Sequence, residues 1–168
     1  MKEGDVRTGL YFTHRSALIE YATPILGSRE AAEDVVQDAY LRFSPATTHV
    51  VSPEKALAYL YRIVRNLAFD ILRHRKIEKR EVGESAPFWA KSRAEGTPED
   101  SLLYYDQIRL VSEVLETLPT KVRVAVEMHR FGGFTLQEVA DHLGISVALA
   151  HRYVRSAMLQ IAARIEPH

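Results

Sequence analysis

The stretch from Thr135 to Ala157 constrains the fold of this chain most, because it carries start and stop patterns for two short helices. Thr135 and Glu138 have the spacing of a capping box, in which each side chain accepts a hydrogen bond from a backbone N–H at the helix start. Gly144 stands where that helix must end in a left-handed conformation, and Ser146 can cap a second helix. The apolar face of the first helix consists of Leu136, Val139, Ala140 and Leu143.

The second helix of this stretch has two different faces. Its inward residues are predicted to be Ala150, Tyr153, Val154 and Ala157. Its outward residues include Val147, Ala148, His151, Arg152 and Arg155. The turn is too short for parallel packing, so the helices cross steeply, as in a helix-turn-helix that lays its second helix in the major groove of DNA. An ordinary helical hairpin in a protein core is the alternative, and the agreement of several spacings at once favours DNA binding.

Composition narrows the class of protein. The 168 residues are 46% hydrophobic and 26% charged, which is typical of a globular protein, and the absence of cysteine excludes disulfides and thiolate metal sites. The first residues lack an apolar stretch of signal-peptide length, and no run reaches the ~18 residues of a membrane span. We therefore expect a cytoplasmic protein with no direct membrane insertion.

The sequence offers little support for an enzyme. Its seven histidines are scattered and form no HExxH motif. Glu138 and His142 stand at i and i+4, a spacing that is more typical of a surface pair than of a metal site with a missing third ligand. No glycine-rich loop follows a strand, as a phosphate-binding loop would. We predict no catalytic residues, no metal and no cofactor.

The formal net charge is zero, but the charges are distributed unevenly. Residues 62–80 contain seven basic and two acidic side chains, whereas residues 97–117 contain one basic and five acidic ones. For nucleic-acid binding the distribution of charge matters more than its total. A basic segment able to hold phosphates is therefore compatible with the neutral chain.

The periodicity along the chain predicts an all-α protein with two small helical domains. The first domain, residues 8–80, contains helices at 10–22 and 28–43 and a long helix that opens at Ser52 and Pro53. The predicted core stripe of the long helix is Leu57, Leu60, Val64, Leu67 and Ile71. Residues 81–96 lose the pattern and read as a flexible linker. The second domain, residues 97–165, contains helices at 97–118 and 119–131 and the helix-turn-helix at 135–157.

Several segments in a fixed order resemble one family. AEDVVQDAYLRF, AYLYRIVRNLAFDILR and LPTKVRVAVEMHRFGGFTLQEVADHLGIS are similar to conserved segments of extracytoplasmic-function (ECF) sigma factors of the sigma-70 family. The resemblance covers almost the whole chain and implies an alternative sigma factor that directs RNA polymerase to promoters. RNLAFDILR and HRYV resemble the iron-starvation (FecI-like) subgroup, which implies iron-uptake genes as targets.

The resemblance implies a polymerase-binding face on the second helix. An acidic and amide face there suits the arginines of a partner helix. A merely solvated helix face is the alternative. The residues implied to contact core RNA polymerase are Asp34, Gln37, Asp38 and Leu41.

The long helix is implied to capture the melted −10 element of the promoter. Asn66 occupies the position that relatives use for an unstacked base, and an amide can donate and accept together. Aromatic rings there can stack on bases, and basic side chains can hold phosphates. Relatives often carry tryptophan at position 59, so the stacking surface is smaller here. The implied −10 contacts are Tyr59, Tyr61, Arg62, Arg65, Asn66, Arg73, Arg75 and Lys76.

The helix-turn-helix is implied to anchor the −35 duplex. Arginine forks match the acceptors of guanine in the major groove, and apolar side chains can touch thymine methyls. The implied −35 contacts are Val147, Ala148, Leu149, His151, Arg152 and Arg155.

Other partners also follow from the resemblance. The implied partners are core RNA polymerase, promoter DNA and an anti-sigma factor of the membrane-anchored, FecR-like kind. The pair Phe88 and Trp89 can anchor the linker in the polymerase or pack on either domain. The rival hypothesis is a helix-turn-helix regulator that recruits polymerase without replacing its sigma factor.

Overall fold

The computed structural model describes residues 3–43, 52–79 and 101–165, and over these ranges the chain is all-helical, as predicted. The helices form two compact units. The N-terminal unit contains α1 (Glu3–Leu26), α2 (Arg29–Arg42), α4 (Pro53–Lys79) and the first half of α5 (Ser101–Thr117) up to Arg109. The C-terminal unit begins at Leu110 and contains α6 (Thr120–Val126), η2 (Glu127–Phe131), α7 (Leu136–Leu143) and α8 (Val147–Ile165). The predicted linker, with Phe88 and Trp89, lies outside the described residues.

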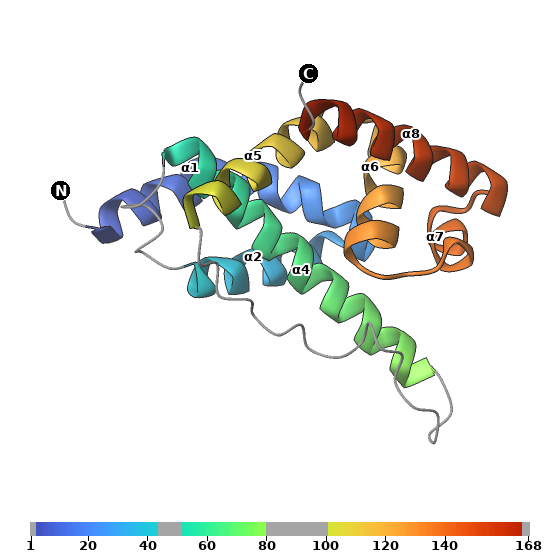
Figure 1. The fold of residues 1–168 in the computed structure, drawn as a ribbon. Helices are drawn as coiled ribbons and strands as arrows, with labels where there is room; N and C mark the ends of the chain where they lie inside the picture. The colour runs from blue at the N-terminus through green and yellow to red at the C-terminus, as the bar shows by residue number, and fades with distance from the viewer. Residues whose placement is uncertain (1–2, 44–51, 80–100, 166–168) are drawn as a thin grey trace. The chain divides into compact units, whose positions relative to one another are not determined.

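In the N-terminal unit each of α1, α2 and α4 packs against the other two (Figure 1). α2 is amphipathic, and its buried face includes Val35, Val36 and Ala39, as its spacing predicts. The side chains that are fully or almost fully buried between these helices are Leu18, Ile19, Ile25, Val36, Leu60, Val64 and Phe69. The opposite face of α2 is thereby left at the surface.

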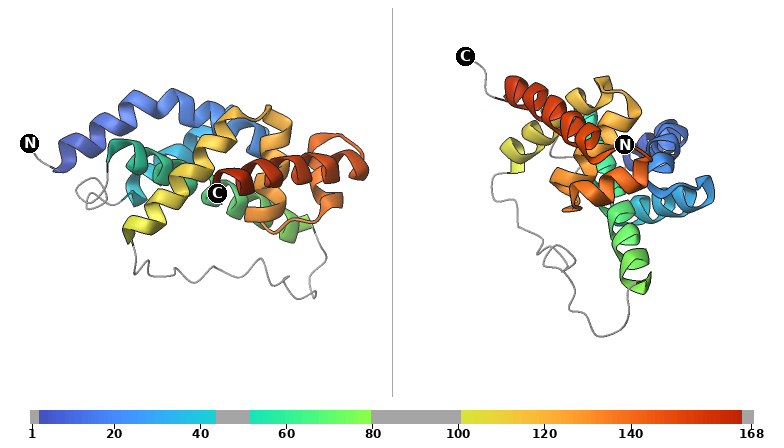
Figure 2. Two further views of the ribbon diagram at one scale, coloured as in Figure 1. Left: turned by 45° about the horizontal axis from the view of Figure 1, so that its top comes forward. Right: turned by 90° about the vertical axis from the view of Figure 1, so that its right-hand side faces the viewer.

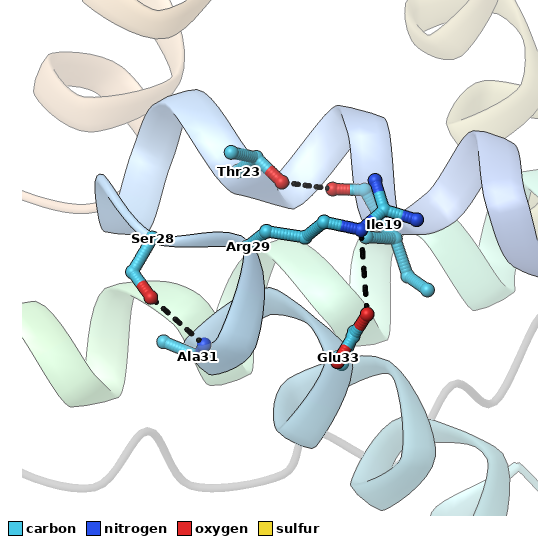
Figure 3. Close-up of polar contacts among 6 residues, drawn as sticks. All are labelled: Ile19, Thr23, Ser28, Arg29, Ala31 and Glu33. Carbon is cyan, nitrogen blue, oxygen red and sulfur yellow. Dashed lines mark hydrogen bonds and ion pairs between the residues drawn. The ribbon is translucent and has the colours of Figure 1, made fainter.

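α1 and α2 are joined by a tight turn at Gly27 and Ser28. Gly27 has φ +79°, and its N–H donates to Thr23 O at 2.7 Å, which ends α1. Ser28 is the predicted cap of α2, and its Oγ accepts from Ala31 N at 3.2 Å (Figure 3). Figure 3 also shows the ion pair between Arg29 and Glu33 one turn later, at 3.3 Å. These contacts fix the start of the helix that carries the predicted polymerase-binding residues.

α1 is longer than its sequence pattern predicted. The expected end before Pro24 is wrong, because the helix continues through Pro24 to Leu26. Proline lacks an N–H, but in the last turn of a helix this removes only one hydrogen bond. Thr23 Oγ1 donates to Ile19 O at 2.6 Å in the same turn (Figure 3). The helix therefore ends at the glycine and not at the proline.

α4 begins as predicted but buries a different stripe. Ser52 Oγ accepts from Lys55 N at 3.3 Å, and Pro53 occupies the first helical position. Leu60 and Val64 of the predicted stripe are buried, whereas its other members, Leu57, Leu67 and Ile71, are only half-buried. The remaining buried positions of α4 are Ala56, Ala58, Arg65, Ala68 and Phe69. Small alanines on α4 allow α1 and α2 to approach it closely. A prediction that considers only large apolar residues does not detect such buried alanines.

In the C-terminal unit α8 packs against α6 and α7 (Figures 1 and 2). The predicted single helix over 119–131 is interrupted, because from Glu127 to Phe131 the backbone takes a π-helical turn. Gly132 N donates to Glu127 O at 2.8 Å and closes this wider turn. The core of the unit includes Val114, Leu115, Val124, Val126, Val139, Ala150 and Ile161.

Candidate nucleic-acid interface

The start of the helix-turn-helix has the predicted capping box. Thr135 Oγ1 accepts from Glu138 N at 3.1 Å, and Glu138 Oε1 accepts from Thr135 N at 2.8 Å. Both bonds satisfy backbone donors that a helix start leaves unpaired. Val139 and Ala140 are the buried residues of α7, whereas Leu136 and Leu143 are half-buried. The capping residues therefore fix where α7 begins.

The turn of the motif also follows its sequence. Gly144 has φ +69° and ψ +37°, the left-handed conformation that glycine adopts without a steric penalty. Gly144 N and Ile145 N both donate to Ala140 O, the second at 3.0 Å. Ser146 Oγ then accepts from Leu149 N at 3.0 Å and caps α8. The turn between the two helices is therefore stabilised by the left-handed conformation of Gly144, by two backbone hydrogen bonds and by the Ser146 cap.

α8 divides its side chains between core and solvent. Ala150, Val154, Ala157 and Ile161 are buried, and Tyr153 is half-buried. The exposed residues in the first half of the helix include Val147, Ala148, His151, Arg152 and Arg155. Leu149, also predicted to contact DNA, is half-buried. Two arginines and a histidine therefore project on the outer face of the helix, where a DNA duplex could approach.

α4 carries the predicted −10 residues on two different sides. With 100° per residue, Tyr59, Arg62, Asn66 and Arg73 form one stripe opposite the buried side of the helix, and all four are half-buried. Tyr61 faces α1, where its ring meets the ring of Tyr21 edge-on at 4.9 Å. The helix therefore groups four of the eight predicted residues on one face.

Tyr59, the first residue of this stripe, lies among other aromatic rings. Its ring centroid is 6.5 Å from that of Phe43 and 5.1 Å from that of Tyr105, which meets it edge-on. Tyr105 belongs to the first half of α5 and is itself buried. One turn before Tyr59 in α4, Lys55 forms an ion pair with Asp106, the residue after Tyr105. Tyr59 is therefore packed against two rings of the N-terminal unit and stays half-buried.

Three arginines predicted to hold phosphates are engaged by the protein. Arg65 is only 8% exposed, and its Nη1 donates to Tyr21 Oη at 3.3 Å. Its contact with DNA stays a prediction. Arg73 forms an ion pair with Asp70, one turn before it. Arg75 is exposed, and its Nη1 donates to Leu26 O at 3.0 Å, in the last turn of α1. Arg62 and Lys76 are both half-buried.

The outer face of α2 carries all four predicted polymerase contacts. Asp34, Gln37, Asp38 and Leu41 are exposed, and Leu41 is 66% exposed despite its large apolar side chain. Asp38 also forms an ion pair with Arg42 at 3.6 Å. The exposed face of α2 therefore combines carboxylates, an amide and one large apolar side chain.

Two buried charged residues were missed by the sequence interpretation. Arg123 Nη1 donates to Glu127 Oε1 at 2.9 Å, and neither side chain is more than 10% exposed. The available pattern was a pair of opposite charges at i and i+4 among Val124, Val126 and Met128. Such a pair reads first as a surface contact, because ion pairs at this spacing are common on exposed helix faces.

The comparison with known families decides what these two helical units are. Residues 10–78 match the family description "Sigma-70 region 2", and residues 108–161 match "Sigma-70, region 4". The chain belongs to the sigma-70 family. It is an ECF sigma factor, which directs RNA polymerase to promoters and is not an enzyme. The match to region 2 supports a sigma factor over the rival hypothesis of a regulator that leaves the resident sigma factor in place.

Several ECF sigma factors are similar to the chain. The ferric citrate uptake sigma factor FecI of Escherichia coli is 28% identical over 89% of this chain and 84% of its own length. The probable ECF sigma factor SigI of Mycobacterium tuberculosis is 27% identical over 99% of this chain, which spans 60% of the length of SigI. The sigma factor RpoE of Bartonella quintana, solved with the anti-sigma factor NepR, is 19% identical over 89% of this chain with a TM-score of 0.38.

Two further searches of the described residues gave negative results. Among the helices described, none combines the length and apolar character needed to cross a bilayer. In the same part of the chain, no three His, Asp or Glu side chains are arranged to hold a metal ion.

Proposed function

We propose that this sigma factor anchors the −35 duplex of its promoters through the outer face of α8. The observation that carries the proposal is the capped helix-turn-helix, which leaves His151, Arg152 and Arg155 exposed on one helix. Val147, Ala148 and Leu149 lie in the first turn of the same helix, where apolar side chains can meet thymine methyls. In this geometry the N-terminal part of the second helix enters the major groove.

The melted −10 element is proposed to bind the stripe on α4 that contains Tyr59, Arg62 and Asn66. The stripe combines a stacking ring, a cation and an amide, the groups that single-stranded DNA binding requires. Lys76 and the exposed Arg75 extend the positive charge toward the end of the helix. Tyr61 and Arg65 contact Tyr21 of α1 beside the stripe, and Arg73, the last residue of the stripe, pairs with Asp70.

Core RNA polymerase is proposed to contact the outer face of α2. Support comes from the exposure of Asp34, Gln37, Asp38 and Leu41 on one helix whose other face is buried. An acidic surface around an apolar centre suits a basic partner helix.

The target genes are proposed to include iron-uptake genes, with the protein acting in the cytoplasm under a membrane-anchored anti-sigma factor. This placement is supported by the RNLAFDILR and HRYV segments and by the similarity to the ferric citrate uptake sigma factor. Sequencing of the DNA bound by the reconstituted holoenzyme tests the placement. Enrichment of promoters unrelated to iron uptake contradicts it.

Reconstituted transcription and binding assays test whether α8 binds the −35 duplex while α2 binds core polymerase. Core polymerase with this protein alone is expected to start transcripts, and Arg152→Ala is expected to weaken binding of the −35 duplex while affinity for core polymerase is unchanged. Loss of one arginine-guanine pair, worth about 1–3 kcal/mol, corresponds to at least about a 5-fold loss in affinity.

Arg164→Ala is the matched control. It removes the same charge from the same helix, about 18 Å further along its axis. Its exposed ion pair with Glu113, at 2.6 Å, contributes little to stability. Equal losses from the two variants, or a loss of polymerase binding with Arg152→Ala, contradict the assignment.

A further inference from the structure

The C-terminal unit contains a buried charged pair at the junction of α6 and η2, the elements that precede the helix-turn-helix. Arg123 belongs to α6 and is 8% exposed, and Glu127, the first residue of η2, is 0% exposed. The guanidinium donates to the carboxylate at 2.9 Å. Their neighbours in the sequence, Val124, Val126 and Met128, are also buried. Two charges therefore occupy positions that apolar side chains would also fill.

Stability alone does not account for this pair. Removing two charges from water carries a large desolvation penalty, and an apolar pair of similar volume is often as stable or more stable. Buried ionic pairs are retained in some proteins because their directional contacts allow only one packing arrangement. Because Glu127 is the first residue of the π turn, the arrangement concerned is the change from α-helix to π turn.

Glu127 lies at the junction between the α-helix and the π turn. Its N–H donates to Arg123 O and Val124 O, and its carbonyl accepts from Gly132 N at 2.8 Å. A π turn contains one residue more per hydrogen-bonded loop than an α-helix, so the direction of the chain after Phe131 depends on whether the turn forms. The residue whose carboxylate pairs with Arg123 is thus the residue at which the π turn begins.

The segment between the π turn and α7, residues 132–134, is closely packed. A Cβ on Gly132 would lie 2.8 Å from Met128 O and 3.0 Å from the ring of Phe134, so the backbone is closely packed there. Phe134 is buried, its N–H donates to Met128 O at 3.0 Å, and its carbonyl contacts His129 Nδ1 at 2.8 Å. Thr135, the cap of α7, is the next residue.

We propose that Glu127, held by Arg123, is a positioning residue for recognition of the −35 duplex. The pair fixes the π turn, the turn fixes the start of α7, and α8 is placed because it packs against both α6 and α7. Glu127 acts through these elements and touches no DNA. This inference rests on the proposed role of α8 in binding the −35 duplex.

The test uses the full chain and a duplex chosen by the unmodified protein from a library of random sequences. The double variant Arg123→Met with Glu127→Leu removes both charges with little change in volume. Its thermal stability is expected to stay within a few degrees of the unmodified protein, about the effect of a small stability change. The ratio of its affinities for the selected and a scrambled duplex, measured by fluorescence anisotropy, is expected to fall about 10-fold.

Val114→Ala is the matched control, because it creates a cavity in the core of the same unit on a different helix, α5. It is expected to lower thermal stability and to leave the affinity ratio unchanged. An unchanged ratio in the double variant overturns the proposal, as does an equal fall in the control. If the double variant does not fold, Glu127→Gln decides by the same ratio: a fall supports the proposal, and no change overturns it.

The failure of the proposed function has a different result. In that case the unmodified protein selects no sequence from the library, or Arg152→Ala leaves the affinity for the selected duplex unchanged. Failure of the positioning role alone leaves both of those results intact.

Discussion

Replacing Gly144 with alanine isolates the contribution of a single backbone conformation to the helix-turn-helix. A Cβ at this position meets no atom within 4 Å, so the substitution creates no clash. The remaining penalty comes from φ +69°, which costs an L-residue roughly 1–2 kcal/mol. Alanine also reduces the freedom of the unfolded chain, which offsets about 0.4–1 kcal/mol. The expected net destabilisation is about 1 kcal/mol.

Hydrogen exchange in α7 and α8, followed by mass spectrometry on the full chain, measures this change where it occurs. A loss of about 1 kcal/mol corresponds to roughly 5-fold faster exchange of the protected amides. Exchange in α1 and α2 serves as an internal reference, because those helices belong to the other unit. The reference amides are expected to exchange at their original rates.

Gly144→Asn is the matched variant, because asparagine tolerates the left-handed conformation better than alanine. It is expected to lose less than half as much protection as Gly144→Ala. If alanine leaves the exchange rates unchanged, or if asparagine is as harmful as alanine, the backbone explanation of this turn is refuted.

Three further substitutions test other parts of the molecule. Gly132→Ala is expected to lower the free energy of unfolding of the C-terminal unit by about 1–3 kcal/mol in denaturant unfolding, because its Cβ would overlap Met128 O. An effect smaller than that of Gly144→Ala contradicts the tight packing. Thr135→Ala is expected to cost about 1 kcal/mol through loss of its cap, with Thr135→Ser close to the original stability in thermal unfolding. Asn66→Ala is expected to weaken holoenzyme binding to a −10 fork-junction DNA about 10-fold, the loss of one or two hydrogen bonds, while binding of −35 duplex is unchanged. Equal weakening on both DNAs contradicts the role of Asn66.

Structural features that depend on residues close together in the sequence were predictable. The capping box, the left-handed Gly144 and the caps at Ser28 and Ser146 each depend on residues no more than three positions apart, and each is present in the structure. The outward set on α8 follows from the same local periodicity. Local rules also placed the exposed face of α2.

Features that depend on packing between distant segments were not predictable in this way. The stripe that α4 buries is set by the helices that approach it, so Ala56 and Ala68 are buried while Leu57 and Leu67 are not. Arg65 is buried because Tyr21, 44 residues earlier, accepts its hydrogen bond. Such contacts have no pattern within a single helix.

The π turn escaped prediction for a related reason. Its sequence, EMHRF, continues the amphipathic pattern of α6, whereas the close packing that follows it involves Gly132 and Phe134. Intrinsic helix propensity does not distinguish the two kinds of turn at such a junction. The role of each predicted DNA or polymerase contact stays a prediction, because it requires the partner.

The two-residue connection at Gly27 and Ser28 has a consequence for the folding pathway. Closing so short a loop loses little chain entropy, so the pairing of α1 with α2 is the most local tertiary contact of the N-terminal unit. The docking of α4 must instead close a much longer stretch, as the bond from Arg75 to Leu26, 49 residues apart, illustrates. We therefore expect the α1–α2 hairpin to form before α4 docks. The face of α2 proposed for polymerase would then take shape early in folding, ahead of the surface on α4 proposed to hold the melted strand.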